Sequence, residues 1–298
     1  MRVLAPAKLN LGLRIVGRRP DGTHELESVF VPIDLADELE IEIEDPADGP
    51  AEVALALSGG GGGVPADAQN LAARAARAFL DTAGLRARVR IALAKRIPAA
   101  AGLGGGSSDA GAVLRALAER FPGAVGRERL AALALRLGAD VPFFLDPRPA
   151  LVSGVGERQA PLPGHLPALP IVLANPGHPV PTARVFTAYA AAATRHGPVG
   201  RLAQQLAAAL AGPEQGVAGR LAALVANDLE AAAETVCPEL AAVRAALRGA
   251  GAPVVGLSGS GGTLYGIFAT PSAAESALAR LRLAPPAWVR LARTVESR

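Results

Sequence analysis

The sequence predicts an α+β protein built from two domains. In the first half, short β-rich segments alternate with helical patterns, which indicates helices packed on a sheet. A proline-rich passage, residues 161–170 (PLPGHLPALP), separates this half from a second one that reads as a helix-covered antiparallel sheet. The length of 298 residues favours about two domains. We therefore expect one domain at residues 1–160 and another at residues 161–298.

Strands open the first half. Valine, leucine, isoleucine and phenylalanine gather in residues 2–16 and 28–44, on either side of the turn signal at residues 19–22, so we expect two paired strands. A third β-rich segment, residues 51–57, runs into five glycines at residues 59–63. No lysine and no strand-to-helix pattern follow these glycines, so we interpret them as a flexible hairpin tip and not as a phosphate loop.

A strand and helices follow in the same half. Apolar residues recur at helical spacing in residues 70–85, and residues 87–93 alternate as in a strand. After a glycine-rich segment, residues 107–120 predict a long helix rich in alanine and leucine. Another helix, over residues 127–137, is expected to end at Gly138.

The second half alternates helices and strands around another glycine-rich turn, which lies between two of the strands. We expect strands at residues 171–174, 254–257, 263–268 and 289–294, and helices at residues 181–195, 200–211, 237–249 and 272–281.

Charge and cysteine content exclude several classes of protein. Lys plus Arg total 30 against 27 for Asp plus Glu, and this mild excess favours anionic ligands. Aromatic residues make up 3% and are not interleaved with basic runs, which excludes a nucleic-acid groove. Cys237 is the single cysteine, so neither an intramolecular disulfide nor a zinc site is expected. Because no signal-peptide core or membrane span is apparent, we expect a cytoplasmic protein without a membrane partner.

The strongest chemical signal is the glycine-rich segment before the long helix, residues 98–109 (PAAAGLGGGSSD). Glycines let successive backbone N–H groups face one concave nest, and the positive end of the helix dipole adjoins it, so the segment suits phosphate oxygens. It is not a Walker A loop, because no Gly-Lys-Ser/Thr follows, and Ser107 stands where a dinucleotide-binding motif needs its third glycine. The structural alternative is a glycine linker followed by a serine N-cap.

This segment resembles the ATP-phosphate motif of the GHMP kinases, the superfamily of galactokinase, homoserine kinase, mevalonate kinase and phosphomevalonate kinase. The longer glycine run before the two serines is similar to the diphosphocytidyl-methylerythritol kinase branch. The resemblance implies that ATP phosphates are bound by Pro98, Gly102, Leu103, Gly104, Gly105, Gly106, Ser107 and Ser108.

Other segments agree with this branch in their order along the chain. Residues 6–11 and 17–26 resemble its first motif, and residues 257–263 (LSGSGGT) resemble the third motif of the superfamily. Residues 138–143 (GADVPF) and 227–230 (NDLE) lie between them and are also similar. The resemblance implies an N-terminal nucleotide-binding domain of the ribosomal protein S5 domain 2-like type, a C-terminal ferredoxin-like domain, and the use of ATP and Mg²⁺.

Asp140 and Lys8 are the candidate catalytic residues. Phosphoryl transfer needs a proton acceptor and charge neutralisation. Asp140 follows a helix end and precedes Pro142, so spacing alone favours the N-cap of a short helix as much as a catalytic base. Lys8 lies among leucines of a predicted strand, where a solvated side chain is the default. The resemblance implies instead that Asp140 is the general base and that Lys8 holds it and stabilises the transferring charge.

The resemblance also assigns ligand contacts. Ser107 or Ser108 would face Mg²⁺ and the β-phosphate. Thr23 stands where many members of the branch carry a tyrosine that stacks on cytosine, and a threonine cannot stack. The other implied contacts are Asn70 and Lys95 near adenine, Asn10, His24, Thr182 and Phe186 near the cytidine diphosphate end of the substrate, and Ser258, Gly259 and Gly261 in a turn that closes over the active site.

The implied reaction moves the γ-phosphoryl group of ATP to the 2-hydroxyl of a cytidine diphosphate-linked methylerythritol in the non-mevalonate isoprenoid pathway. Two alternatives are another GHMP kinase, of the homoserine or mevalonate type, and a non-catalytic nucleotide-binding protein of the same fold. Residues 21–24 and 227–230 argue against the first, and the presence of both Lys8 and Asp140 argues against the second. A Rossmann dehydrogenase fails on glycine spacing.

Overall fold

The chain forms two compact units, each assembled from several segments. The first unit holds Met1–Ala7, Leu35–Ala99 and Gly104–Pro147, and the second holds Lys8–Asp34, Ala100–Leu103 and Arg148–Arg298. The predicted domain boundary after residue 160 stays a prediction, and residues 148–160 lie in the second unit. The computed structural model describes residues 1–45, 49–59, 63–162, 165–192, 199–210, 216–222 and 224–296.

Two long strands begin the chain and contribute residues to both units. These strands, β1 (Arg2–Arg18) and β2 (His24–Glu44), pair with each other. The turn between them is closed by a hydrogen bond from the Gly22 N–H to the Arg19 carbonyl at 2.9 Å, and Gly22 has a φ of 87°. The predicted strand pair and its turn are confirmed.

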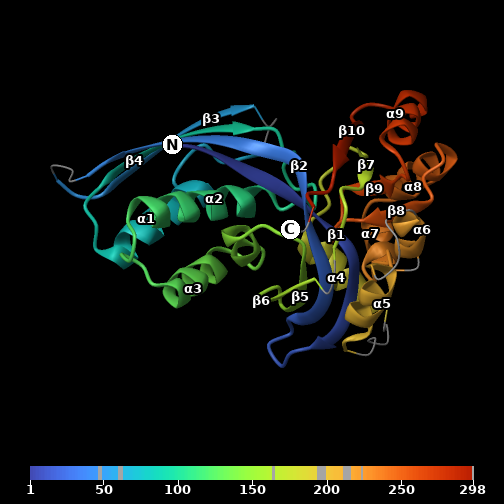
Figure 1. Ribbon diagram of the computed structural model, residues 1–298, viewed down its shortest axis with the longest axis horizontal. Coiled ribbons are helices and arrows are strands. Elements are labelled where there is room, and N and C mark those ends of the chain that lie inside the picture. Colours follow the sequence, from blue (N-terminus) through green and yellow to red (C-terminus); the bar gives the residue numbers. More distant parts are fainter. Residues whose placement is uncertain are drawn as a thin grey trace. The chain divides into compact units, whose positions relative to one another are not determined.

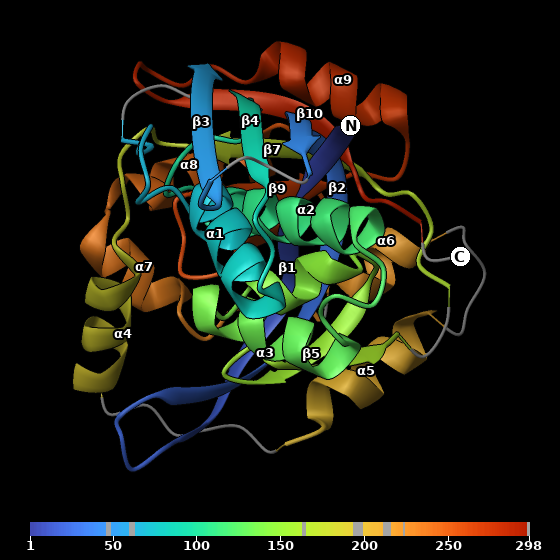
Figure 2. The same cartoon turned by 90° about the vertical axis from the view of Figure 1, so that its left-hand side faces the viewer.

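The first unit is a sheet with helices on one face. The second half of β2 is antiparallel to β4 (Arg88–Lys95), and β4 is parallel to β3 (Glu52–Gly59). Helices α1 (Leu71–Ala83) and α2 (Gly105–Arg120) lie side by side against this sheet, as Figures 1 and 2 show, and α3 (Arg127–Leu137) packs on both of them. The strand alternation places Val89, Ile91 and Leu93 in the core.

The predicted hairpin after β3 is not formed. A hairpin joins antiparallel strands, whereas β3 and β4 are parallel and are connected through α1. The prediction was wrong because a glycine run resembles a turn whether the chain returns in a hairpin or continues into a crossover. Residues 60–62 of this run lie outside the described residues.

The second unit contains two groups of strands. The first half of β2 is antiparallel to β5 (Ala150–Gly154), which pairs with β6 (Arg158–Pro161). A separate antiparallel sheet has the order β10-β7-β9-β8. Its strands are β7 (Pro170–Asn175), β8 (Val254–Leu257), β9 (Leu264–Ile267) and β10 (Trp288–Arg293).

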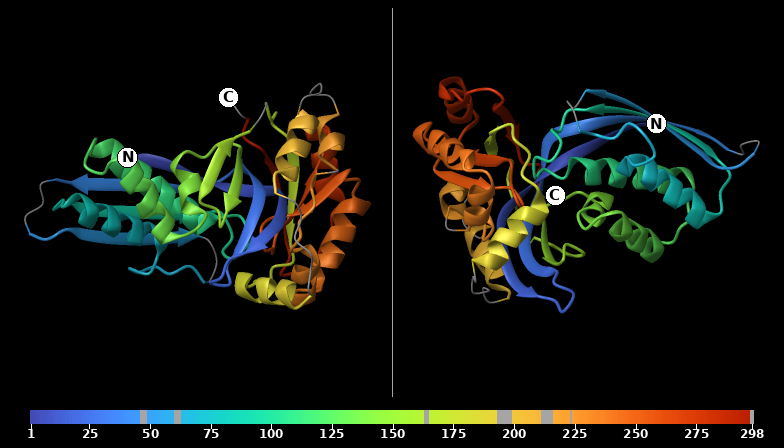
Figure 3. Two further views of the ribbon diagram at one scale, coloured as in Figure 1. Left: turned by 90° about the horizontal axis from the view of Figure 1, so that it is seen from below. Right: turned by 180° about the vertical axis from the view of Figure 1, so that it is seen from behind.

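Helices cover the antiparallel sheet of the second unit. Helices α8 (Glu239–Gly249) and α9 (Pro271–Arg280) share one apolar cluster with Val172 and Ala174 of β7, so both pack on the same face (Figure 3). The predicted helix-covered antiparallel sheet is confirmed. The remaining helices are α4 (Thr182–Ala191), α5 (Arg201–Leu210), α6 (Val217–Leu221) and α7 (Glu230–Val236).

Within the described ranges, no helix combines the length and the apolar character that a membrane crossing requires.

Candidate active site

The predicted phosphate loop leads directly into the N-terminus of α2. Gly102 has a φ of 75° and Gly104 a φ of 71°, which is the left-handed region that favours glycine. Gly104 is the N-cap of α2, and its carbonyl accepts a hydrogen bond from the Ser108 N–H at 2.8 Å. The backbone therefore turns within a few residues from an irregular loop into a helix whose first N–H groups are available to an anion.

Ala100 is the one described non-glycine residue with a positive φ, at 51°. Its β-carbon makes this conformation less favourable by roughly 1–2 kcal/mol than it would be for glycine. A non-glycine residue in this conformation is therefore a point of strain in the loop.

The two serines of the loop differ in their surroundings. Ser108 is buried, and its hydroxyl donates a hydrogen bond to the Pro6 carbonyl at 2.7 Å. Ser107 is only half-buried. Both serines lie in the first unit together with α2. Of the two, Ser107 has the hydroxyl that is better exposed to a ligand at the start of the helix.

Asp140 lies at the N-terminus of a short 3₁₀ helix, η1 (Val141–Leu145), as its position before Pro142 predicted. Its carboxylate makes no capping hydrogen bond to this helix. The preceding turn is closed by the Val141 N–H, which donates to the Gly138 carbonyl at 3.1 Å. A β-carbon at Gly138 would lie 3.9 Å from the Ser107 Oγ, so this turn lies next to the start of α2.

Helix α2 also fixes the other end of η1. A β-carbon at Gly111 would lie 2.4 Å from the Phe144 Cβ and 2.8 Å from the Phe144 carbonyl oxygen. Arg115, one turn further along α2, donates a hydrogen bond to the same carbonyl. The absence of a side chain at Gly111 therefore allows the short helix that carries Asp140 to lie against α2.

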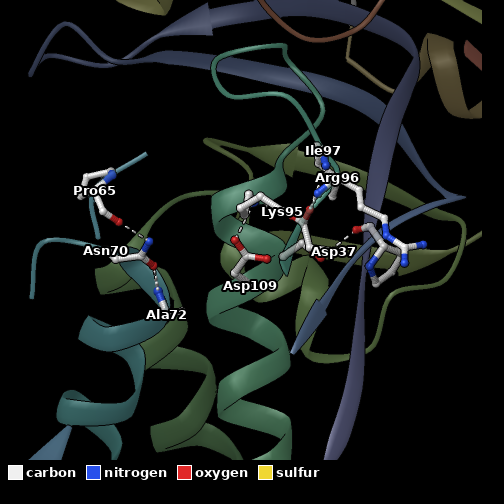
Figure 4. A network of polar contacts seen from close by, with 10 residues as sticks. Asp37, Pro65, Asn70, Ala72, Lys95, Arg96, Ile97 and Asp109 are labelled. Atoms are coloured by element: carbon white, nitrogen blue, oxygen red, sulfur yellow. Dashed lines mark hydrogen bonds and ion pairs between the residues drawn. The ribbon is translucent and has the colours of Figure 1, made fainter. Parts of the chain in front are cut away.

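Lys95, which we expected near adenine, lies in a buried cluster with two carboxylates (Figure 4). Its ammonium donates to Asp37 and, at 2.7 Å, to the Asp109 Oδ2. The three side chains are at most 3% exposed. Burial raises the pKa of the Asp109 carboxyl to about 7, although the neighbouring Lys95 ammonium acts in the opposite direction. The predicted contact between Lys95 and adenine stays a prediction.

Asn70 forms the N-cap of α1 (Figure 4). Its Oδ1 accepts a hydrogen bond from the Ala72 N–H at 2.9 Å, and its Nδ2 donates to the Pro65 carbonyl at 2.7 Å. Both ends of the side-chain amide therefore organise the start of α1. The predicted role of Asn70 near adenine is likewise untested.

In the second unit, Lys8 is buried and not solvated, with 4% of its surface exposed. Its ammonium donates to the Asn10 Oδ1 at 2.7 Å and lies 4.6 Å from the centre of the Phe30 ring. Its backbone N–H donates to the Leu103 carbonyl at 3.0 Å. The strand residue Lys8 is thus tied to the glycine loop by its backbone and held in orientation by its side-chain partners.

The glycine turn of the third motif lies beside Lys8. A β-carbon at Gly259 would lie 3.6 Å from the Lys8 Nζ, and the Ser258 hydroxyl donates to the Gly102 carbonyl at 2.9 Å. The Asn227 Nδ2 donates to the Gly259 carbonyl at 2.7 Å, which supports the turn from behind. Segments that resemble family motifs and lie far apart in the sequence therefore meet in one place within the second unit.

Asn10 is the hub of this arrangement. Its Oδ1 accepts from Lys8, and its Nδ2 donates to the Ser28 hydroxyl at 2.8 Å. The Tyr265 hydroxyl donates to the Asn10 carbonyl at 2.8 Å. Ser28 and Tyr265 were not predicted as site residues, and their only sequence signal is a polar group inside an apolar strand pattern.

An aromatic group lies elsewhere in the second unit. The His24 and Phe186 rings are stacked, with centres 5.1 Å apart and an angle of 27° between their planes. The buried Tyr189 ring meets His24 edge-on at 5.8 Å and was not predicted as part of this group. The hydroxyls of Thr182 and Ser260 lie 2.8 Å apart. The structure thus brings together His24 and Phe186, two of the four residues that we expected near the cytidine diphosphate end.

Comparisons with known proteins show the family to which this chain belongs. Family models described as GHMP kinases N terminal domain and GHMP kinases C terminal match residues 70–146 and 188–287. A 4-diphosphocytidyl-2-C-methyl-D-erythritol kinase of Deinococcus radiodurans is 42% identical over 285 residues, which cover 95% of this chain and 89% of that protein. The Thermus thermophilus kinase of the same name is 43% identical over 288 residues, which cover 97% and 95% of the two chains.

Solved structures give the same result. The crystal structure of a 4-(cytidine 5'-diphospho)-2C-methyl-D-erythritol kinase is 41% identical, covers 99% of this chain and 100% of its own, and has a TM-score of 0.78. A homoserine kinase from Cytophaga hutchinsonii shares the fold, with a TM-score of 0.72 and 19% sequence identity. The match covers 99% of this chain and 95% of the homoserine kinase. The predicted fold class and family are therefore confirmed. This chain belongs to the GHMP kinases and, among them, to the family of the 4-diphosphocytidyl-2-C-methyl-D-erythritol kinases.

Proposed function

We propose that this chain transfers the γ-phosphoryl group of ATP to the 2-hydroxyl of 4-diphosphocytidyl-2-C-methyl-D-erythritol, in the cytoplasm and as part of the non-mevalonate isoprenoid pathway. Relatives that carry this name match almost the full length of the chain. The observation that carries the proposal is the glycine loop at the start of α2, with the turn before Asp140 beside Ser107. The proposal is supported by the fact that residues 104–108 of the loop and Asp140 belong to the same unit.

The phosphates of ATP would be held by the backbone N–H groups of residues 102–108. The glycines of this loop leave room for phosphate oxygens, and the N-terminus of α2 adds favourable electrostatic potential. Mg²⁺, when bound, would neutralise charge on the triphosphate. A hard cation prefers oxygen ligands, and the half-buried Ser107 offers a hydroxyl there, whereas the Ser108 hydroxyl already donates to Pro6.

Asp140 would accept the proton of the attacking hydroxyl. It lies at the start of η1, after a turn that lies next to Ser107, and the family resemblance assigns this role to it. Lys8 would stabilise negative charge on the transferring group from within a dry environment, where such an interaction is stronger than in water. Asn10 holds the Lys8 ammonium in one orientation.

The acceptor would be recognised by residues of the second unit. His24 and Phe186 provide an aromatic surface for cytosine, and Tyr189 buttresses the His24 ring. Asn10 and Thr182 provide polar contacts for the cytidine diphosphate end. The turn with Ser258, Gly259 and Gly261 would close over the substrate, and the two glycines have φ values of 60° and 112°.

The test is a comparison of acceptors. ADP release is measured with Mg-ATP and 4-diphosphocytidyl-2-C-methyl-D-erythritol, and separately with homoserine, mevalonate and galactose. We expect turnover with the cytidylyl substrate alone. Turnover with one of the other acceptors only would contradict the proposed substrate while leaving a kinase, and ATP binding without any turnover would favour a non-catalytic protein.

A further inference from the structure

The buried cluster of Asp37, Lys95 and Asp109 lies at the base of the glycine loop (Figure 4). Lys95 is the last residue of β4, and Asp109 lies in the first turns of α2. The loop leaves the sheet after Lys95 and enters the helix at Gly105. The ion pair between Lys95 and Asp109 therefore connects the strand before the loop to the helix after it.

Asp37 holds the strand side of the loop in a second way. Its Oδ1 accepts hydrogen bonds from the Ile97 N–H at 2.8 Å and from the Arg96 N–H at 2.5 Å, while its Oδ2 accepts from Lys95. Arg96 and Ile97 are the first residues after β4. One carboxylate thus fixes the direction in which the backbone leaves the sheet.

The two ends of the loop also touch each other. A β-carbon at Gly105 would lie 2.9 Å from the Ile97 Cγ2 and 3.3 Å from the Lys95 Nζ. Because Gly105 is the first residue of α2, the helix start lies directly on the strand exit. The spacing between the two ends is therefore set by the cluster and by the absence of a side chain at position 105.

Resting on the proposed binding of ATP by this loop, we propose that Asp37, Lys95 and Asp109 are positioning residues that hold the phosphate nest in its binding geometry. Backbone N–H groups bind phosphate only when they converge on it, and the direction of α2 decides where its first N–H groups point. The Lys95 ammonium is engaged by two buried carboxylates and serves this cluster. A contribution to folding stability does not by itself explain why these three charged side chains are buried. Replacing a buried ion pair by apolar residues often leaves a protein at least as stable.

Asp109→Ala tests the proposal, because it removes the link to α2 and leaves the pair between Asp37 and Lys95. We expect the KM for ATP to rise roughly tenfold or more, since small displacements of binding groups have large effects on positioned reactants. The KM for the acceptor should stay within about twofold of the wild type. Asp109→Asn keeps an oxygen for the Lys95 ammonium, so its KM for ATP should rise only roughly two- to threefold above that of the wild type.

Ile91→Ala is the control for stability alone. Ile91 is buried in β4, four residues before Lys95 at the end of the strand, so this variant should lower the melting temperature without changing the KM for ATP. An Asp109→Ala variant that melts early but keeps the wild-type KM for ATP would overturn the proposal. Should Asp109→Ala not fold, Asp109→Asn decides: a rise of roughly two- to threefold in the KM for ATP is expected, and no change would overturn the proposal.

A direct binding measurement separates this proposal from the function on which it rests. Calorimetric titration with ATP reports affinity without any phosphoryl transfer. If the wild-type protein does not bind ATP, the proposed function fails. If the wild-type protein binds ATP and Asp109→Ala binds it equally well, only the positioning role fails.

Discussion

At the scale of single residues, each unit contains a buried lysine that organises the polar groups around it. Both Lys8 and Lys95 lie in strands and are buried, and each is engaged by specific polar partners. The sequence pointed to both lysines only through the family resemblance, because strand periodicity alone cannot distinguish a buried, paired lysine from a solvated one. Asp37 was not predicted at all, since its role depends on backbone N–H groups about sixty residues away.

Asp140→Asn should abolish most of the activity. Loss of the proton acceptor is expected to lower kcat by roughly 10² to 10⁴, the range typical of general base catalysis. The affinity for ATP should change by less than about twofold, because the loop that binds the phosphates is untouched. Asp81→Asn, which changes an exposed carboxylate in α1, is the control and should keep its kcat. A wild-type kcat for Asp140→Asn would show that another group takes the proton.

Cys237 should be unreactive in the folded protein. Burial, aided by the neighbouring Glu239, raises the pKa of the Cys237 thiol to about 11. At about pH 8 only about one thiol in a thousand is then a thiolate, and the thiolate is the reactive form. Alkylation by iodoacetamide should be roughly a hundredfold slower in the native protein than in urea, and should accelerate as the pH rises toward 11. Equal rates in the two states would contradict this.

At the scale of elements, the periodic patterns predicted most helices and strands, but several short elements were not predicted. Strands β5 and β6 and helices α6 and α7 span only four to seven residues each, which leaves little periodicity to read. The equally short β8 and β9 were predicted, because their apolar residues flank a glycine-rich turn. The observed α2 begins two residues before the predicted start, because Gly105 and Gly106 carry no apolar signal. The crossover between β3 and β4 was missed because the glycine run resembles a turn.

Asn70→Ala should destabilise the protein through the start of α1. Loss of the N-cap is expected to cost about 1 kcal/mol of folding free energy. Removal of the side-chain amide also leaves the Pro65 carbonyl without its hydrogen-bond donor. Thr270→Ala, which removes the N-cap of α9 and an exposed contact with the Ser272 hydroxyl, should cost less. Chemical denaturation of both variants measures the difference. A smaller loss for Asn70→Ala than for Thr270→Ala would contradict this account of the Asn70 contacts.

Gly111→Ala should affect both stability and catalysis. The added β-carbon would overlap Phe144, and overpacking of this kind costs about 1–3 kcal/mol. The short helix that carries Asp140 would have to move away from α2, so kcat should fall as well. Gly249→Ala, where a β-carbon meets no atom within 4 Å, is the control; it should stabilise the protein by up to about 1 kcal/mol and leave kcat unchanged. Thermal unfolding measures the change in stability, and initial rates measure the change in kcat. An unchanged kcat would show that catalysis does not depend on the position of η1 against α2.

At the scale of the whole molecule, colinear motifs predicted the family and the fold class, while the compact units did not follow from sequence. The first unit takes up residues 1–7 and 35–147 except for residues 100–103, so long strands contribute to both units. A composition shift such as the proline-rich passage marks a place along the chain, whereas a compact unit depends on which strands pair. Strand pairing between distant segments leaves little trace in local sequence.

The central claim is the identity of the reaction, and the most direct test is ³¹P NMR of the product. After incubation of the protein with Mg-ATP and 4-diphosphocytidyl-2-C-methyl-D-erythritol, we expect ADP and one new phosphomonoester signal in equal amounts. Carbon–phosphorus coupling should place this phosphate on the 2-hydroxyl, and Asp140→Asn should not produce it. Formation of inorganic phosphate without a new phosphomonoester, or a phosphate on another hydroxyl, would contradict the account.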